Sequence, residues 1–210
     1  MSSIPGISIP GIDVSHFQGT IDWNAVAQTG KLFAFAKATQ GLTYVDPQFH
    51  ANWAGAKAAG LLRGAYHFYQ PGDDPRQQAE FFLETVGLGP GDLPPALDVE
   101  ISNGQTSGEI VHGVQEWLST VQQALGVTPL LYTDRTFWNT LGTEGFGGYP
   151  LWIAEYGVTS PLLPAGWTSW TFWQSSETGT VPGVTGSTDL DLFQGSLEDL
   201  RTLVIPGTIG

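Results

Sequence analysis

Short apolar runs alternate with amphipathic stretches over the first two thirds of the chain. The runs are rich in Phe, Val, Ile and Tyr, which is typical of strands, whereas the stretches between them show helical spacing. Asp22 and Asp74 precede such stretches and are expected to cap helices, and Ser107 is expected to cap a long helix that ends at Gly126. The strands predicted in this part are residues 11–15, 32–38, 64–69, 96–100 and 129–133, with helices at 23–28, 47–60, 75–86 and 107–126.

The pattern changes after residue 136. Residues 137–148 are rich in glycine and support at most two helical turns. Eight strands with repeated crossovers favour a barrel, but a complete eightfold α/β barrel usually takes about 250 residues. The 210 residues therefore predict an α/β, TIM-like barrel whose helices are lost around the last three strands. Those three strands are predicted at residues 151–156, 169–174 and 188–193, followed by a short helix at 197–203.

No repeat or low-complexity linker divides the sequence, so a single catalytic domain is expected over residues 1–210, with a barrel core at about 11–205. No separate wall-binding module is expected. The first residues lack the basic and apolar regions of a signal peptide, and no apolar run approaches the ~18 residues that span a membrane.

Charge and cysteine content exclude several function classes. The chain has 7 Lys and Arg against 20 Asp and Glu, a net charge of −13, so a basic surface for nucleic acid or an anionic membrane is not expected. It has no Cys, which excludes disulfides and thiolate chemistry. Its 4 His residues show no close ligand spacing, so neither a metal nor a cofactor is expected. An uncharged polysaccharide remains compatible as a partner.

Asp98 and Glu100 form the sharpest feature of the sequence. Residues i and i+2 of a strand point to the same face, about 6.5 Å apart at Cα. Two such carboxyl groups in a barrel mouth resist ionising together, so one pKa should rise and leave a proton to donate near neutral pH. The alternative is an acidic pair that merely ends a strand in solvent. The apolar run at residues 93–97 favours the functional reading.

Other strands carry polar and aromatic residues near their expected mouth ends. Barrels of this kind place their active sites where the strands end, and a glycosidase needs carboxylates together with flat rings for sugars. Asp13 and Asp189 are the further acidic candidates, although Asp13 could equally cap a turn. The candidates for substrate binding are Tyr66, His67, Tyr69, Tyr132, Trp152, Glu155, Trp173, Gln174 and Asp191. A structural role is the alternative for His67, and a solvated surface position for Glu155 and for one of Asp189 and Asp191.

Several segments together resemble family 25 of the glycoside hydrolases, the Chalaropsis-type lysozymes, which are N-acetylmuramidases. They occur in the family's order and are GIDVSHFQG at 11–19, FAKAT at 35–39, GAYHFY at 64–69, LDVE at 97–100, LWIAEY at 151–156, WQ at 173–174 and the segment around Asp189. The resemblance implies a barrel of five β/α units and three extra strands, (β/α)5(β)3. It also implies cleavage of the β-1,4 bond between N-acetylmuramic acid and N-acetylglucosamine in peptidoglycan.

The resemblance implies a role for each central acid. Glu100 would be the general acid/base, and Asp98 would orient the 2-acetamido group of the sugar or stabilise the cationic centre. Asp13 and Asp189 would support them. Relatives often have Asn two residues after the last of these acids, where this chain has Asp191, so either Asp189 or Asp191 could be the supporting acid.

The close pair of carboxyl groups favours attack by the substrate's own acetamido group, with retention at the anomeric carbon. The two alternative functions are a chitinase-like glycosidase and a barrel that only binds glycan. A chitinase-like enzyme would need acids at positions 93 and 96, which are Leu93 and Ala96, and a barrel that only binds glycan would be expected to have lost a central acid. A monomer that acts outside the cell on the wall is expected.

Overall fold

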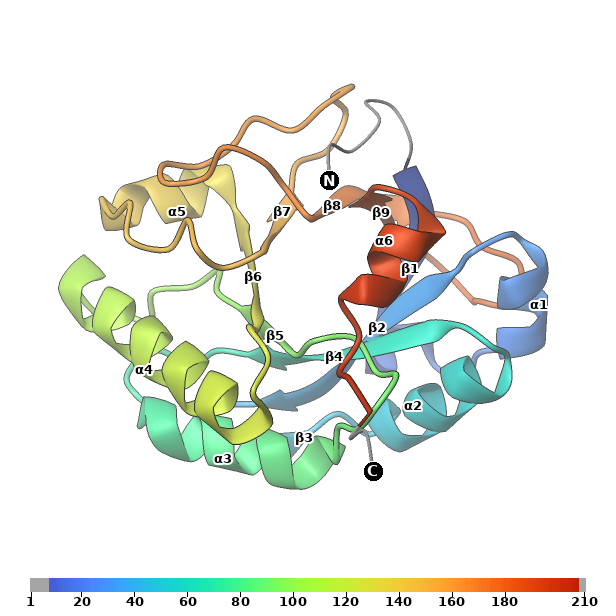
Figure 1. Ribbon diagram of the computed structural model, residues 1–210, viewed down its shortest axis with the longest axis horizontal. Helices are drawn as coiled ribbons and strands as arrows, with labels where there is room; N and C mark the ends of the chain where they lie inside the picture. Colours follow the sequence, from blue (N-terminus) through green and yellow to red (C-terminus); the bar gives the residue numbers. More distant parts are fainter. Residues whose placement is uncertain (1–7, 208–210) are drawn as a thin grey trace.

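The computed structural model describes residues 8–207, in which all strands form one mixed sheet. Eight strands close into a barrel in the order β1-β2-β4-β5-β6-β7-β8-β9, because β9 pairs with β1, and the short β3 adds to the edge of β2 (Figure 1). This confirms the predicted TIM-like barrel. The strands are β1 (Ser8–Val14), β2 (Phe33–Gln40), β3 (Tyr44–Val45), β4 (Leu62–Phe68), β5 (Ala96–Asp98), β6 (Leu130–Asp134), β7 (Leu151–Ala154), β8 (Phe172–Gly179) and β9 (Thr188–Gln194).

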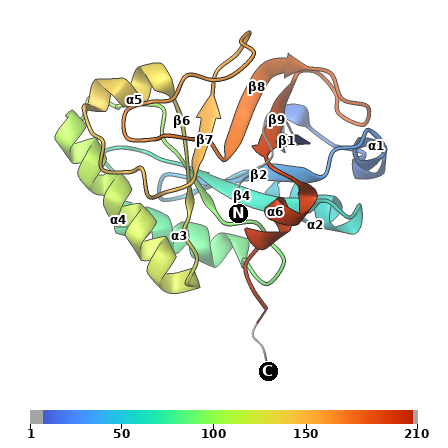
Figure 2. The ribbon, with the colours of Figure 1, turned by 45° about the horizontal axis from the view of Figure 1, so that its top comes forward.

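Helices α1 to α4 cover the first half of the barrel (Figures 1 and 2). Asp22 caps α1 and Asp74 caps α3, as expected. The cap of α4 is Thr106 and not Ser107, because Thr106 and Glu109 form a reciprocal capping box over the first turn. The helices are α1 (Trp23–Gln28), α2 (Phe49–Ala58), α3 (Pro75–Val86), α4 (Ser107–Leu125), α5 (Arg135–Leu141) and α6 (Leu197–Thr202), with a 3-10 turn η1 (His16–Gln18).

The second half of the barrel differs from the first. A short α5 follows β6, whereas loops join β7 to β8 and β8 to β9 (Figure 2). β8 begins at Phe172, three residues later than predicted, and β9 runs antiparallel to both of its neighbours. The start of β9 therefore lies beside the end of β1, with Asp189 paired to Asp13. No helix in residues 8–207 is long and apolar enough to cross a membrane.

Large rings fill the inside of the barrel next to residues without side chains. Phe33 lies beside Gly11, and Phe35 beside Gly64; a Cβ on either glycine would come within 2.4 Å of the ring. Phe35 also stacks on Trp152 with 4.6 Å between ring centroids. Leu200 of α6 joins this inner cluster near the starts of β5 and β6. Side chains therefore fill the barrel at the end where the parallel strands begin.

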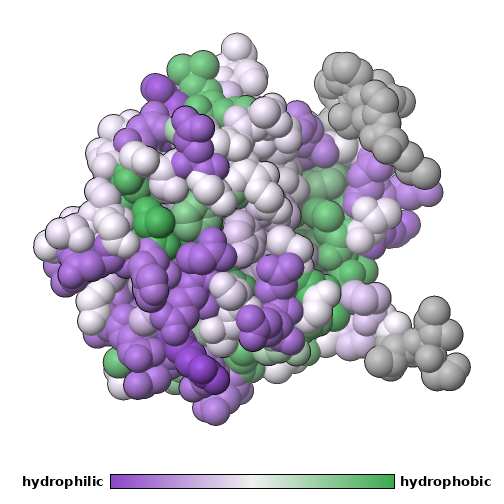
Figure 3. Space-filling view, turned by 60° about the vertical axis from the view of Figure 1, so that its left-hand side comes forward, coloured by the Kyte–Doolittle hydropathy of each residue, from purple (hydrophilic) through white to green (hydrophobic). Residues whose placement is uncertain are grey.

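A second apolar layer lies between the barrel and its helices. Trp117 of α4 and Phe82 of α3 are fully buried there, against the outward side chains of the strands. The solvent side of these helices is polar: Figure 3 views the side of the molecule on which α4 and α5 lie, and hydrophilic residues gather over its lower part, at the height of α3 and α4 in Figure 1.

Candidate active site

A cavity of about 240 Å³ opens at the end of the barrel where the parallel strands finish. We call it the mouth cavity. Since strand residues alternate between the inside and the outside of a barrel, the strands contribute their inward-facing residues to it. Its lining includes Asp13, Ser15, Phe17, Gln18, Lys37, Tyr66, Phe68, Asp98, Glu100, Tyr132, Trp152, Tyr156, Gln174, Glu177 and Asp189.

Asp98 ends β5, and Glu100 follows it into the same cavity. The backbone between them forms hydrogen bonds with the segments on both sides, after β4 and in β6. The amide of Tyr69 donates to the Asp98 carbonyl at 2.9 Å, and the amide of Val99 donates to the Tyr132 carbonyl at 3.0 Å. These bonds prolong the strand pattern by two residues, so the two carboxyl groups face the same way as the sequence spacing predicted.

The two carboxyl groups differ in environment. Asp98 is only 6% exposed, and its Oδ1 atom is buried without a hydrogen-bond partner among the described residues. Burial and the neighbouring Glu100 raise the pKa of Asp98 well above its usual range. Glu100 keeps contact with solvent at the cavity rim; loss of hydration raises its pKa, while Lys37 opposes the rise. A proton is therefore held in this pair closer to neutral pH than in either acid alone.

Lys37 is the counter-charge of this pair. It is the single Lys or Arg in the described lining of the mouth cavity. Its Nζ atom donates to Gln40 Oε1 at 2.8 Å and lies 4.5 Å from the centre of the Phe68 ring. Burial lowers the pKa of Lys37, and the nearby Asp98 acts in the opposite direction. One partly buried ammonium thus offsets part of the negative charge of the cavity.

Three more acids meet on the opposite wall, where β1 and β9 pair. Asp13 accepts a 2.6 Å hydrogen bond from Gln174 Nε2, and Asp191 accepts one of 2.8 Å from Trp152 Nε1. Burial raises the pKa of Asp13 well above its usual range, and Asp191 adds to the rise. Burial and Asp13 raise the pKa of Asp189 to about 8. Asp189 lines the cavity, whereas Asp191 lies behind it. Asp191 therefore acts on the cavity only indirectly, through its hydrogen bonds with Trp152 and Asp13.

The sequence matches one family of known enzymes over most of its length. The model described as "Glycosyl hydrolases family 25" matches residues 12–184, which include every central acid except Asp189 and Asp191. The chain belongs to glycosyl hydrolase family 25. It is therefore a glycoside hydrolase.

Relatives of this family 25 enzyme agree with that assignment. Lysozyme M1 of Streptomyces globisporus is 38% identical over 216 residues, covering 93% of this chain and 71% of that protein. The N,O-diacetylmuramidase of a Chalaropsis species is 28% identical over 213 residues, covering 93% and 99%. The crystal structure of a lysozyme from Streptomyces coelicolor matches with a TM-score of 0.90 at 35% identity, covering 95% of this chain and 98% of that one.

Besides Asp191, four expected binding residues of the family 25 enzyme do not line the mouth cavity. His67 and Tyr69 lie on the outer face of β4 and its end, because they alternate with the inward Tyr66 and Phe68. His67 is fully buried, bonds Thr39 and Gln78, and has a pKa lowered by burial to about 4. The same alternation turns Glu155 and Trp173 outward, where the indole of Trp173 donates to the Glu155 carbonyl.

Other lining residues were not expected from the sequence of this family 25 member. Phe17, on the turn η1 after β1, is 79% exposed beside the cavity, and Glu177 lies in the second half of β8. Phe68 lines the cavity, although the sequence had suggested its neighbour His67. The alternation along β4 gave a usable signal for Phe68, since only one of two adjacent residues can face inward. No sequence pattern marked Phe17 or Glu177.

Proposed function

We propose that this enzyme is a muramidase that hydrolyses the β-1,4 bond between N-acetylmuramic acid and N-acetylglucosamine in peptidoglycan. The observation that carries the proposal is the pair Asp98 and Glu100, both facing one cavity among the aromatic side chains of Tyr66, Tyr132 and Trp152. Carboxyl groups supply the acid and base work of glycoside hydrolysis, and aromatic rings favour the apolar faces of sugars. The names of the lysozyme and muramidase relatives support the substrate.

Glu100 is the proposed general acid/base. Its raised pKa keeps a proton available, and its place at the rim allows it to reach a glycosidic oxygen. On protonation of that oxygen the bond to the anomeric carbon breaks, and the leaving sugar keeps the proton. The ionised Glu100 then takes a proton from the water that completes hydrolysis.

Asp98 is the proposed partner that steers the 2-acetamido group. Its unpaired Oδ1 atom is free to accept the N–H of that group, and the acetamido oxygen then attacks the anomeric carbon from the opposite side. With the shared proton on Glu100, the ionised Asp98 stabilises the positive charge that develops in the transition state. Asp13, Asp189 and Gln174 hold the other wall of the cavity, with Asp191 behind them.

This route makes net retention the expected outcome. Proton NMR on the first product released from a β-linked glycan distinguishes the two outcomes. An initial β-anomer agrees with acetamido assistance, whereas an initial α-anomer means inversion by a directly attacking water and would overturn this mechanism.

We propose that the enzyme acts on the wall glycan outside the cell, as a monomer. Every described residue that lines the mouth cavity belongs to this one chain, and the barrel at residues 11–205 is the proposed catalytic domain.

Digestion of purified peptidoglycan tests the function directly. Mass spectrometry of the borohydride-reduced products should find N-acetylmuramic acid at the new reducing ends. Reducing ends of N-acetylglucosamine, or cuts confined to the peptide stems, would contradict the proposal. The Glu100→Gln protein serves as the matched control and should release no product above background.

A further inference from the structure

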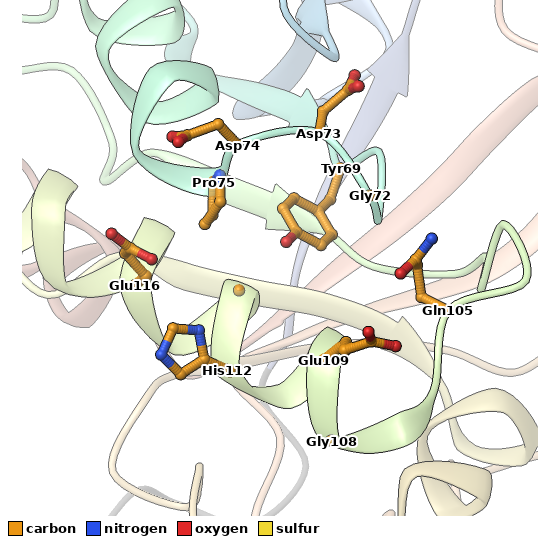
Figure 4. A pocket seen from close by; sticks show the side chains of 11 residues that line it. Tyr69, Gly72, Asp73, Asp74, Pro75, Gln105, Gly108, Glu109, His112 and Glu116 are labelled. Atoms are coloured by element: carbon orange, nitrogen blue, oxygen red, sulfur yellow. The ribbon is translucent and has the colours of Figure 1, made fainter.

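A second cavity, of about 730 Å³, lies outside the barrel wall between the start of α3 and the first turns of α4 (Figure 4). We call it the helix cavity. Its position follows from strand alternation: Phe68 lines the mouth cavity, while the next residue, Tyr69, lines the helix cavity on the other side of the wall. The proposed hydrolysis uses none of the groups inside it.

The helix cavity is rich in carboxyl groups. Asp73, Asp74, Glu109 and Glu116 line it together with His112, and its described lining contains no Lys or Arg. Asp74 and Glu109 are occupied in capping α3 and α4. The Glu116 side chain, by contrast, makes no hydrogen bond or ion pair with any residue in the described range. A free carboxylate in such a setting favours a cationic ligand.

Tyr69 gives an independent sign of a ligand. Its side chain is 2% exposed, and its ring lies in the cavity beside Pro75 and α4 (Figure 4). The hydroxyl group has no hydrogen-bond partner among residues 8–207, and it is accessible from the cavity, where a ligand can reach it. Gly113 leaves the space for it, because a Cβ there would lie 2.0 Å from the Tyr69 oxygen. The cavity thus presents a hydroxyl group and a carboxylate that both lack a partner among the described residues.

The lining fits an organic cation. No group of three or more His, Cys, Asp or Glu in the described residues is arranged to hold a metal ion. The ring of Tyr69 and the side chain of Pro75 instead offer apolar surface to an aliphatic chain, and an aromatic ring also attracts an ammonium group.

The two cavities lie on opposite sides of one rim, since the adjacent residues Phe68 and Tyr69 line one each. The amide of Tyr69 donates to the Asp98 carbonyl at 2.9 Å, and the loops on either side are joined by a 2.6 Å hydrogen bond from Asn103 Nδ2 to Gln70 Oε1. A substituent on a sugar in the mouth cavity therefore has a short way over this rim to the helix cavity. The muramic acid of peptidoglycan carries such a substituent, a peptide stem whose diamino acid bears a primary amine.

We propose that the helix cavity binds the free amine of this peptide stem, with Glu116 as the carboxylate that receives the ammonium group and the Tyr69 hydroxyl as an acceptor for one of its N–H bonds. This inference rests on the proposed function, since it takes peptidoglycan as the substrate. Binding of the amine would make the enzyme prefer glycan whose stems are not crosslinked. A crosslink converts the amine to an amide, which carries no charge.

Three soluble oligomers of the same disaccharide repeat test the proposal. One carries stems with a free amine, the second carries the same stems with the amine acetylated, and the third carries no stems. For the unmodified enzyme we expect a KM about fivefold lower for the free amine than for the acetylated form, the size typical of one partly exposed charge pair, at equal kcat. Raising the salt concentration should shrink this difference.

Two matched variants locate the effect. Glu116→Gln should abolish the preference for the free amine and leave the hydrolysis of stem-free oligomers unchanged. Glu84→Gln removes one charge from an exposed position on α3 away from the cavity, and it should keep the preference. Equal KM values for the free and acetylated forms in the unmodified enzyme, or equal effects of the two variants, would overturn the inference.

Binding measured without hydrolysis separates this inference from the function on which it rests. Calorimetric titration of the same oligomers into the Glu100→Gln protein should give the same fivefold preference in Kd. If the unmodified enzyme cuts none of the three oligomers, the proposed function fails. If it cuts all three while the Kd values for free and acetylated amines agree, only the helix-cavity proposal fails.

Discussion

The side-chain amide of Gln174 on β8 donates a 2.6 Å hydrogen bond to the carboxylate of Asp13 on β1, across the intervening strand β9. The oxygen of the same amide accepts the hydroxyl groups of Tyr132 and Tyr156. One neutral side chain therefore connects both walls of the mouth cavity and fixes one oxygen of Asp13.

Gln174→Glu should break this connection. The new carboxylate cannot donate to Asp13 and repels it, so we expect a loss of about 1–3 kcal/mol in the free energy of unfolding at pH 7, the usual cost of disrupting a buried hydrogen bond. The loss should be smaller at pH 5, where protonation restores a donor. Denaturant unfolding at both pH values measures this, and an equal loss at pH 5 and pH 7 would count against the repulsion.

Glu100→Gln should lower kcat by at least about 10³-fold while the fold persists, because general acid catalysis contributes about 10²–10⁴-fold and an amide cannot give up a proton. Turnover of a soluble glycan oligomer and thermal unfolding should be measured together. Glu84→Gln is the control for an equal change of net charge. Activity near that of the unmodified enzyme at unchanged Tm would show that the acid lies elsewhere.

Asp98→Asn should separate activity from stability. The change removes the negative charge that stabilises the transition state, so we expect a severe loss of kcat, by about 10²–10³-fold. Burial raises the pKa of Asp98 in the folded state, which means that the charged form destabilises the fold. The Asn variant should therefore have a higher Tm at pH 7. A lower Tm at that pH would show that the buried carboxylate is stabilising.

The dependence of kcat/KM on pH should be bell-shaped and centred on mildly acidic pH. Loss of hydration raises the pKa of Glu100, so the alkaline limb reports loss of its proton. The acidic limb reports protonation of its partner carboxylates. These limbs belong to the coupled acids of the cavity together. A profile that keeps rising up to pH 9 would contradict Glu100 as the acid.

Stability should fall as pH rises from about 5 to 8. Burial raises the pKa of Asp191 in the folded state to about 7, so the folded protein binds a proton that the unfolded chain releases near pH 4. The stability that this proton contributes is fully present below the pKa that Asp191 has in the unfolded chain. It is lost as pH rises through the pKa of Asp191 in the folded protein, at up to about 1.4 kcal/mol per pH unit.

Asp191→Asn should flatten this dependence, since Asn keeps an oxygen that can accept the Trp152 N–H bond but cannot titrate. Calorimetric Tm values at pH 5, 6, 7 and 8 measure the slope for both proteins. Identical slopes would assign the linkage to Asp13 and Asp189 instead.

Local patterns in the sequence determined most of the barrel and the pair Asp98 and Glu100. Strands, helices and caps follow from periodicity and turn chemistry within a few residues, and an i, i+2 spacing places two side chains on one face wherever the strand lies. The capping residue of α4 was predicted one position late, since Thr106 and Ser107 are both good caps and only the distance to Glu109 separates them.

Only the tertiary structure decided which face of each strand points inward. Periodicity separates Tyr66 from His67 but does not tell which of them meets the lumen; the helices packed outside β4 bury His67 and leave Tyr66 in the cavity. The direction of β9, which brings Asp189 to Asp13, depends on pairing between strands far apart in sequence. The raised pKa values depend on burial, a property of the packed barrel that no short segment of the chain contains.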